Sequence, residues 1–139
     1  MRALTHAILP SRVLDEILAH ARAAAPDECC GLLVGRDGRI HRSSRARNLE
    51  SSPHRYLIDP SDHFAAMRAA RDEGLLVIGA YHSHPDGPAV PSPTDVSEAA
   101  GDSQFVYLIV SLSAAGAQAV GAYLLTAGGA EPLTLTIET

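Results

Sequence analysis

The chain has 139 residues, of which 46% are hydrophobic and 19% are charged, so it can bury a core and is not globally disordered. Its formal net charge of −5 argues against a nucleic-acid-binding protein, which normally presents a basic face. Only 4% of the residues are aromatic, so the core must be made mainly of Leu, Val, Ile and Ala. We therefore expect a single domain over residues 1–139.

Membrane and redox signals point to the cytoplasm. The longest apolar run, Phe105 to Leu112, has the length of a buried strand and is too short to cross a bilayer. The first residues lack the continuous apolar stretch of a signal peptide. Cys29 and Cys30 are adjacent, and a bridge between neighbours is geometrically strained. We expect a cytoplasmic protein with reduced thiols and no membrane partner.

The first predicted elements are a short strand and a helix. Thr5 to Leu9 fits a strand, and apolar residues recur at helical spacing from Val13 to Ala21. Pro26 marks the end of this helix.

A hairpin is predicted next. Cys30 to Val34 is apolar and fits a strand, Arg36 to Arg39 fits a turn, and Ile40 begins the returning strand. We interpret the arginine cluster between Arg36 and Arg47 as a solvated loop, because Gly and Ser residues separate its members. The segment from Ser43 to Pro53 is predicted to be irregular.

A second helix and a buried strand follow. Asp59 can cap the helix, Pro60 suits its first position, and Gly74 should end it. Leu75 to His82 is almost continuously apolar, as is typical of a central strand. The segment from His84 to Pro93 is rich in proline and should form a stiff loop.

The last third of the chain predicts a short helix and three more strands. Ser92 to Asp95 can start the helix. The strands are expected at Phe105 to Leu112, Ala119 to Thr126 and Leu133 to Ile137. The whole order is mixed α and β, with antiparallel neighbours near the C-terminus.

Two histidines end the predicted central strand. His82 and His84 are two residues apart, and side chains at this spacing project to the same side of a strand. Both can therefore bind one ion, and Asp95 can supply a third ligand if the proline-rich loop folds back. Three protein ligands and one open position are typical of a catalytic zinc site, where the metal activates water and polarises a carbonyl.

Such a hydrolase also needs a base to carry the proton of the water to the leaving amine. Glu28, at the mouth of a predicted strand, is our candidate. Spacing alone does not select Glu28 over Asp27, Asp86 or Glu98.

Each of these features also has a purely structural interpretation. A lone His-x-His pair is weak evidence for a metal. Ser92 can be a helix N-cap to which Asp95 reaches back, and Glu28 can be a solvated charge at a strand end. The remaining histidines show no paired spacing and are expected at the surface: His6, His20, His41, His54 and His63.

In combination, the segment from His82 to Pro85, followed by Ser92 and Asp95, closely resembles the signature of the JAMM (MPN-plus) metalloproteases. Glu28 and the glycine-containing strand after it look like the upstream glutamate element of that family. The stretch from Tyr56 to Pro60 is also similar. The resemblance extends from about Glu28 to Leu112.

This resemblance implies a fold, a site and a substrate class. The fold is an α/β structure with a curved mixed β-sheet flanked by helices, related to that of cytidine deaminases. One catalytic zinc ion would be held by His82, His84 and Asp95, with Glu28 as the general acid/base. Ser92 would donate a hydrogen bond to the oxyanion or the water.

The short chain is similar to stand-alone prokaryotic members of the family. Some of these cleave after the Gly-Gly end of ubiquitin-like sulfur carriers. We therefore expect hydrolysis of a peptide or isopeptide bond in a ubiquitin-like or sulfur-carrier protein with an extended C-terminal tail.

Three other functions remain to be weighed. A non-catalytic MPN-like scaffold would bind partners, but such modules usually lose the metal ligands. A deaminase-like zinc enzyme would require a C-x-x-C pair of thiolates. A Cys–His hydrolase would use Cys29 or Cys30, which we instead expect to pack into the strand, one on each face.

Overall fold

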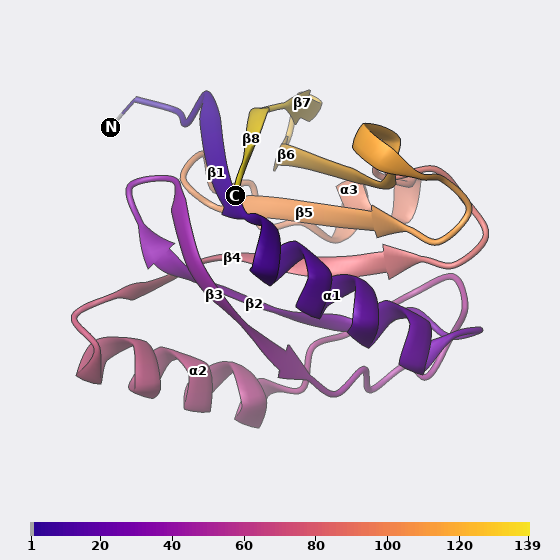
Figure 1. Ribbon diagram of the computed structural model, residues 1–139, viewed down its shortest axis with the longest axis horizontal. Helices are drawn as coiled ribbons and strands as arrows, with labels where there is room; N and C mark the ends of the chain where they lie inside the picture. Colours follow the sequence, from indigo (N-terminus) through magenta and orange to yellow (C-terminus); the bar gives the residue numbers. More distant parts are fainter. Residues whose placement is uncertain (1) are drawn as a thin grey trace.

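A mixed β-sheet with helices on both faces organises the computed structural model, which describes residues 2–139 (Figure 1). Its eight strands lie in the order β7-β6-β5-β4-β2-β3-β1-β8. The strands are β1 (His6–Pro10), β2 (Cys30–Arg36), β3 (Arg39–Ala46), β4 (Leu76–His84), β5 (Val106–Ser111), β6 (Val120–Thr126), β7 (Gly129–Pro132) and β8 (Thr134–Glu138). The helices are α1 (Ser11–Ala24), α2 (Pro60–Asp72), α3 (Pro93–Glu98) and a 3₁₀-helix, η1 (Gly116–Ala119). The predicted fold class is confirmed.

Strand β4 lies inside the sheet and carries the two histidines at its C-terminal end. It pairs antiparallel with β2 and parallel with β5. The pairing with β2 sets Cys30 opposite His82. Glu28, two residues before Cys30, therefore enters the sheet beside the histidines.

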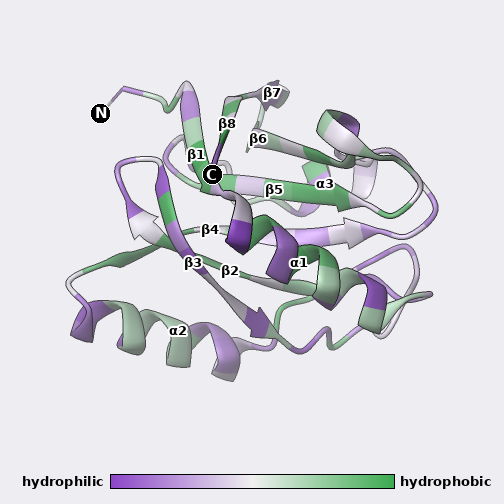
Figure 2. Ribbon diagram, viewed as in Figure 1, coloured by the Kyte–Doolittle hydropathy of each residue, from purple (hydrophilic) through white to green (hydrophobic). Residues whose placement is uncertain are grey.

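The main core lies between α1 and the sheet. Val13, Ile17 and Ala21 follow one side of α1, have no exposed surface, and belong to the same apolar cluster as Tyr81 and Leu108. Hydropathy colouring shows hydrophobic and hydrophilic residues alternating along α1, which lies in front of the sheet in this view, and a mostly hydrophobic β5 (Figure 2). Burying one large aliphatic side chain stabilises a fold by about 1.5–3 kcal/mol, so this layer holds α1 in place.

A smaller core lies on the opposite face of the sheet. Ala66 of α2 packs there with Leu32 and Ala80. Ala80 and His82 are two apart in β4, so they share this face. The face that carries the metal-site histidines is thus covered only in part by α2.

The ends of α2 follow the signals in the sequence. Asp59 Oδ1 accepts a hydrogen bond from Ser61 N at 2.9 Å, and Pro60 is the first helical residue. Gly74, just beyond the helix, has a φ of +72°, a conformation that favours glycine. The predicted helix start at Asp59 and stop at Gly74 are confirmed.

The interpretation of the arginine cluster as a loop was wrong. Residues 39–46 form β3, which pairs with β2 along its whole length. Its other neighbour, β1, pairs with it only where Ile8 lies opposite Arg39. Because one edge of β3 is otherwise unpaired, the strand tolerates a polar sequence without the alternation that marks a half-buried strand. Irregular structure begins only after Ala46, not at Ser43.

Two short C-terminal elements were not predicted. The 3₁₀-helix η1 precedes β6, and β7 begins at Gly129 as a strand of four residues at the sheet edge. Such short segments show no hydrophobic period. Between residues 2 and 139, no helix has the length and apolar character needed to cross a membrane.

Candidate metal centre

The two histidines project to one side of β4 at its end. His82 is fully buried and His84 is partly buried. The ring of Tyr56 stacks on the ring of His82, with centroids 4.3 Å apart and an angle of 21° between the planes. Between the histidines, Ser83 faces away, and its Oγ accepts a hydrogen bond from Cys29 N at 2.8 Å.

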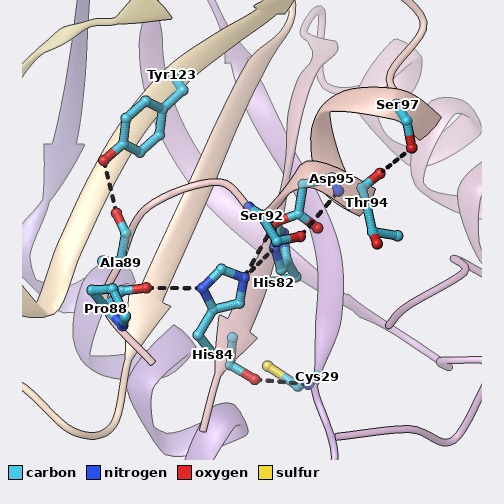
Figure 3. Close-up of polar contacts among 11 residues, drawn as sticks. Cys29, His82, His84, Pro88, Ala89, Ser92, Thr94, Asp95, Ser97 and Tyr123 are labelled. Carbon is cyan, nitrogen blue, oxygen red and sulfur yellow. Dashed lines mark hydrogen bonds and ion pairs between the residues drawn. The ribbon is translucent and has the colours of Figure 1, made fainter. Parts of the chain in front are cut away.

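The loop after His84 is held at three consecutive carbonyl oxygens. His84 Nδ1 hydrogen-bonds Pro88 O at 2.8 Å, and Tyr123 Oη donates to Ala89 O at 2.8 Å (Figure 3). Ser111 Oγ donates to Gly87 O at 2.6 Å. These contacts from β4, β5 and β6 fold the loop back toward the histidines, as the ligand hypothesis requires.

Helix α3 begins where the loop returns. Ser92 Oγ accepts from Asp95 N at 3.1 Å, and Ser92 N donates to Asp95 Oδ2 at 2.9 Å, so the two residues form a capping box. This structural role does not compete with a role at the site. The Ser92 hydroxyl acts only as an acceptor in the cap, and its proton remains available for donation.

Three side-chain atoms converge on one point. His82 Nε2 lies 3.1 Å from Asp95 Oδ2, His84 Nε2 lies 3.2 Å from the same oxygen, and the two Nε2 atoms are 3.2 Å apart. Ligands about 2.0–2.1 Å from a tetrahedral zinc are separated by about 3.3 Å, so the residues present fit a metal ion. Among residues 2–139, this is the one cluster of His, Cys, Asp or Glu with such geometry.

The charges of the three groups suit ligation. Burial alone would raise the pKa of Asp95, but hydrogen bonds with His82 and His84 hold it far below its usual range. Burial lowers the pKa of His82 despite its contact with Asp95. Burial also acts to lower the pKa of His84, yet hydrogen bonds to Asp95 and Pro88 outweigh it and raise this pKa. An ionised carboxylate therefore meets one neutral imidazole and one more basic imidazole.

Glu28 approaches this cluster from the start of β2. Only 4% of the residue is exposed, and its Oε1 is buried without a hydrogen-bond partner in the described part of the chain. Burial raises the pKa of Glu28 to about 7, while nearby His84 acts to lower it and Asp95 to raise it. A carboxyl group with a pKa near neutrality can both accept and return a proton.

Two cavities meet at the cluster. An open cavity of about 520 Å³ is lined by Glu28, His84 and Ser92 together with the proline-rich loop. A second, mostly apolar groove of about 820 Å³ runs over the other side, with Asp95 at its wall. Its apolar lining includes Leu32, Tyr56, Leu57, Ile58, Ala80, Phe105 and Tyr107. The cluster thus lies between a polar pocket and an apolar groove.

The alternative acids are placed differently from Glu28. Glu98 forms an ion pair with Arg55 at 2.5 Å, and Asp86 is exposed at the rim of the polar cavity. Asp27 lines neither cavity. Of the four candidates, Glu28 alone is buried beside the histidines.

The cysteines are not arranged as nucleophiles. Cys29 packs in the main core, whereas Cys30 Sγ points to the carbonyl oxygens of Ala46 and Arg47. Burial raises the pKa of both thiols, that of Cys30 to about 12. A reactive cysteine needs a lowered pKa and some exposure, so the Cys–His alternative loses its support.

The other histidines lie outside the cluster. His6, His41 and His54 are exposed, as expected. His20 and His63 are half-buried, and His20 Nδ1 is within 2.7 Å of Tyr81 Oη. Sequence reasoning missed Tyr56 as a contact of His82, because only tertiary structure brings them together.

The amino-acid sequence of this chain is similar to a known protein family and to several named proteins. The family described as prokaryotic homologs of the JAB domain matches residues 10–123. A probable TtuB-protein conjugate cleaving protease of Thermus thermophilus is 38% identical over 121 residues, covering 86% of this chain and 76% of that protein. A CysO-cysteine peptidase of Mycobacterium tuberculosis is 35% identical over 106 residues, covering 75% of this chain and 72% of that protein.

A solved structure has the same fold. The solution structure of a protein from Desulfitobacterium hafniense superposes with a TM-score of 0.85 at 34% identity. The alignment covers 94% of this chain and 92% of that one.

Proposed function

Since this chain belongs to the family of prokaryotic homologs of the JAB domain, we propose that it is a zinc metallopeptidase that cleaves after the C-terminal Gly-Gly of a ubiquitin-like or sulfur-carrier protein. The family membership confirms the resemblance drawn from the motif and makes the chain a hydrolase of JAMM type. The metal, the role of each residue and the substrate are parts of the proposal.

The convergence of three ligand atoms is the observation that carries it. Two imidazoles and one carboxylate at 3.1–3.2 Å from one another suit zinc, and the approach from the polar cavity leaves a fourth position open to water or substrate. Bound there, zinc would supply Lewis-acid polarisation of the scissile carbonyl and would make water more acidic.

Proton transfer and stabilisation of the oxyanion are assigned to two side chains, Glu28 and Ser92. Glu28 Oε1 takes a proton from the attacking water and delivers it to the leaving nitrogen, a role that a pKa of about 7 supports. The Ser92 hydroxyl donates a hydrogen bond to the carbonyl oxygen as that oxygen gains negative charge. Both side chains line the polar cavity with His84.

The substrate is inferred from the relatives and the groove. The names of the two relatives describe cleavage of TtuB–protein conjugates and of CysO–cysteine. In this chain, the apolar groove leads to the cluster beside Asp95, and Tyr56 stands between the groove and His82. An extended tail can lie along the groove, and glycines next to the scissile bond would bring no side chain against the cluster.

The test is a set of carrier fusions. Sulfur-carrier proteins ending in Gly-Gly would carry a short C-terminal extension, and mass spectrometry would locate the cleaved bond. Matched fusions would replace Gly-Gly by Ala-Ala or Val-Val. We expect cleavage directly after Gly-Gly and strong loss with both replacements. Equal cleavage of all three fusions, or of unrelated extended peptides, would contradict the carrier proposal and indicate a general peptidase.

A non-catalytic scaffold is the alternative of another class. It would bind the carrier without turning it over. The buried Oε1 of Glu28 lies beside a complete ligand set, which favours the enzyme. Burying a carboxyl oxygen without a partner destabilises the fold, and a scaffold would gain nothing from it.

A further inference from the structure

The backbone around Glu28 is held from three sides. Glu28 N donates to Ser52 O at 2.8 Å, and Glu28 O accepts from Asn48 Nδ2 at 3.1 Å. The next amide, Cys29 N, donates to Ser83 Oγ at 2.8 Å. By contrast, the carboxylate oxygen Oε1 has no partner within residues 2–139. The main chain is therefore fixed while the side chain stays available for proton transfer.

The side chain of Asn48 makes four hydrogen bonds. Its Nδ2 donates to Glu28 O at 3.1 Å and to Arg55 O at 3.0 Å. Its Oδ1 accepts from Glu50 N at 3.0 Å and from Leu57 N at 2.9 Å. An amide side chain has two donor hydrogens and two acceptor lone pairs, so Asn48 uses its full hydrogen-bonding capacity. It is also the one asparagine in the sequence.

These bonds tie Glu28 to the wall of the apolar groove. The loop of residues 48–58 is closed by a β-bridge between Asn48 and Ile58 and by a bond from Leu49 N to Leu57 O at 2.9 Å. Tyr56 and Leu57 of this loop line the groove. Tyr56 also stacks on His82. One side chain thus connects the backbone of the acid/base, the groove and a metal ligand.

We propose that Asn48 is a positioning residue that fixes Glu28 relative to the metal ligands and to the groove that receives the substrate tail. The inference rests on the proposed function, because it assigns Glu28 the proton transfer. A purely local role would be confined to the turn at Glu50 and Leu57. The bond to Glu28, twenty residues away in the chain, is what such a turn does not need.

Two substitutions separate these roles. Asn48→Ala removes all four bonds. Asn48→Asp keeps an oxygen for Glu50 N and Leu57 N but loses both donated bonds, including the one to Glu28 O. A misplacement of about 1 Å can cost about 10²-fold in rate, so we expect kcat to fall by about 10-fold to 100-fold in both variants. KM should rise mainly in Asn48→Ala, because only that variant also loses the bond from the amide of Leu57, a residue that lines the groove.

The decisive comparison is a double-mutant cycle with Glu28→Gln. If Asn48 acts through Glu28, adding Asn48→Ala to Glu28→Gln should change the residual turnover by less than about twofold. Metal content should stay at the wild-type level in each variant. Ile17→Val, on the buried side of α1, is the control for general loss of stability and should leave kcat unchanged.

Amide hydrogen exchange of the metal-loaded protein gives a readout that needs no substrate. In Asn48→Ala, exchange should accelerate at Glu50 and Leu57, whose amides donate to Asn48 Oδ1. It should also accelerate at Glu28, because the Glu28 amide donates to Ser52 O in the loop that Asn48 holds. In Asn48→Asp, Glu50 and Leu57 should stay protected. Wild-type kcat in Asn48→Asp, or the same fold-loss in both backgrounds of the cycle, would overturn the inference. If the wild-type protein cleaved no carrier fusion, the proposed function would fail, while unchanged exchange in Asn48→Ala would refute the positioning role by itself.

Discussion

The two sides of the candidate site are built in different ways. His82, His84 and Asp95 lie within fourteen positions of one another and contact each other directly. Glu28 lies far from them in sequence, and residues of other segments hold its backbone. All three ligands therefore come from one local segment, whose loop Ser111 and Tyr123 hold in place, whereas the acid/base side is assembled from segments far apart in sequence. Metal binding and proton transfer should accordingly be separable by mutation.

The largest effect should come from breaking the ligand side. His82→Ala and Asp95→Ala should lose the metal and reduce hydrolysis to background, because two ligands do not make a stable site. Asp95→Ala also removes the bond from Ser92 N that completes the capping box, at a cost on the order of 1 kcal/mol. Elemental analysis and thermal melts would measure the two effects.

Asp95→Asn is the matched control for the cap. Its amide oxygen can still accept from Ser92 N, so the melting temperature of the metal-free protein should stay close to the wild-type value. It should still bind metal poorly, since the negative charge is gone. Full metal content in all three variants would show that the cluster is not the metal site.

A smaller loss should follow from breaking the acid/base side alone. Glu28→Gln keeps the shape of the side chain but cannot carry a proton, so kcat should fall by about 10²–10⁴-fold. The metal content should be unchanged, because Glu28 is not among the three ligands. Parallel loss of metal and activity would mean that Glu28 is itself a ligand or a structural residue.

Ser92 connects the two sides, and its removal should cost somewhat less. Loss of one oxyanion donor typically lowers kcat by about 10²–10³-fold, and we expect this for Ser92→Ala. Ser92→Gly serves as its partner variant, because glycine is nearly as good as serine at an N-cap. Equal kcat values for the two variants, with melting temperatures higher for Ser92→Gly, would assign the rate effect to the hydroxyl. Recovery of activity in Ser92→Gly would assign it to the cap.

The smallest effect concerns stability against pH. Burial raises the pKa of Glu28 from 4.5 to about 7, so the folded metal-free protein binds this proton more tightly than the unfolded chain does. The resulting stabilisation is fully present below pH 4.5 and is lost as the pH rises through 7. Its size should be on the order of 3 kcal/mol.

Thermal melts of the chelated protein across this range would measure that loss. Glu28→Gln should flatten the curve, because its side chain does not titrate. If the stability of the wild type and that of the variant changed with pH by the same slope between pH 5 and 7, a buried carboxyl with a raised pKa at this position would be excluded.

The sequence predicted the local parts of the molecule well. The caps at Asp59 and Ser92, the helix stop at Gly74 and the projection of His82 and His84 to one side all depend on neighbouring residues. Local geometry of this kind can be inferred from spacing.

The contacts between segments far apart in sequence could not be predicted from spacing. Spacing did not separate Glu28 from the other three acids, and only the resemblance to the JAMM family selected it. The contacts of Tyr56 with His82 and of Asn48 with Glu28 join segments that no periodicity relates. The arginines of β3 hide the period-2 pattern, so the sequence indicates a loop there, and only the pairing of β3 with β2 defines the strand.

The most direct test of the metallopeptidase account is reconstitution of the chelated protein. Wild-type protein and Glu28→Gln would each be stripped of metal, returned to one equivalent of zinc, and incubated with a carrier fusion. The account predicts that wild type regains cleavage after Gly-Gly in step with zinc binding, whereas Glu28→Gln binds the same zinc and cleaves at a small fraction of that rate. Full cleavage by the metal-free wild-type protein, or equal cleavage by the two reconstituted proteins, would contradict it.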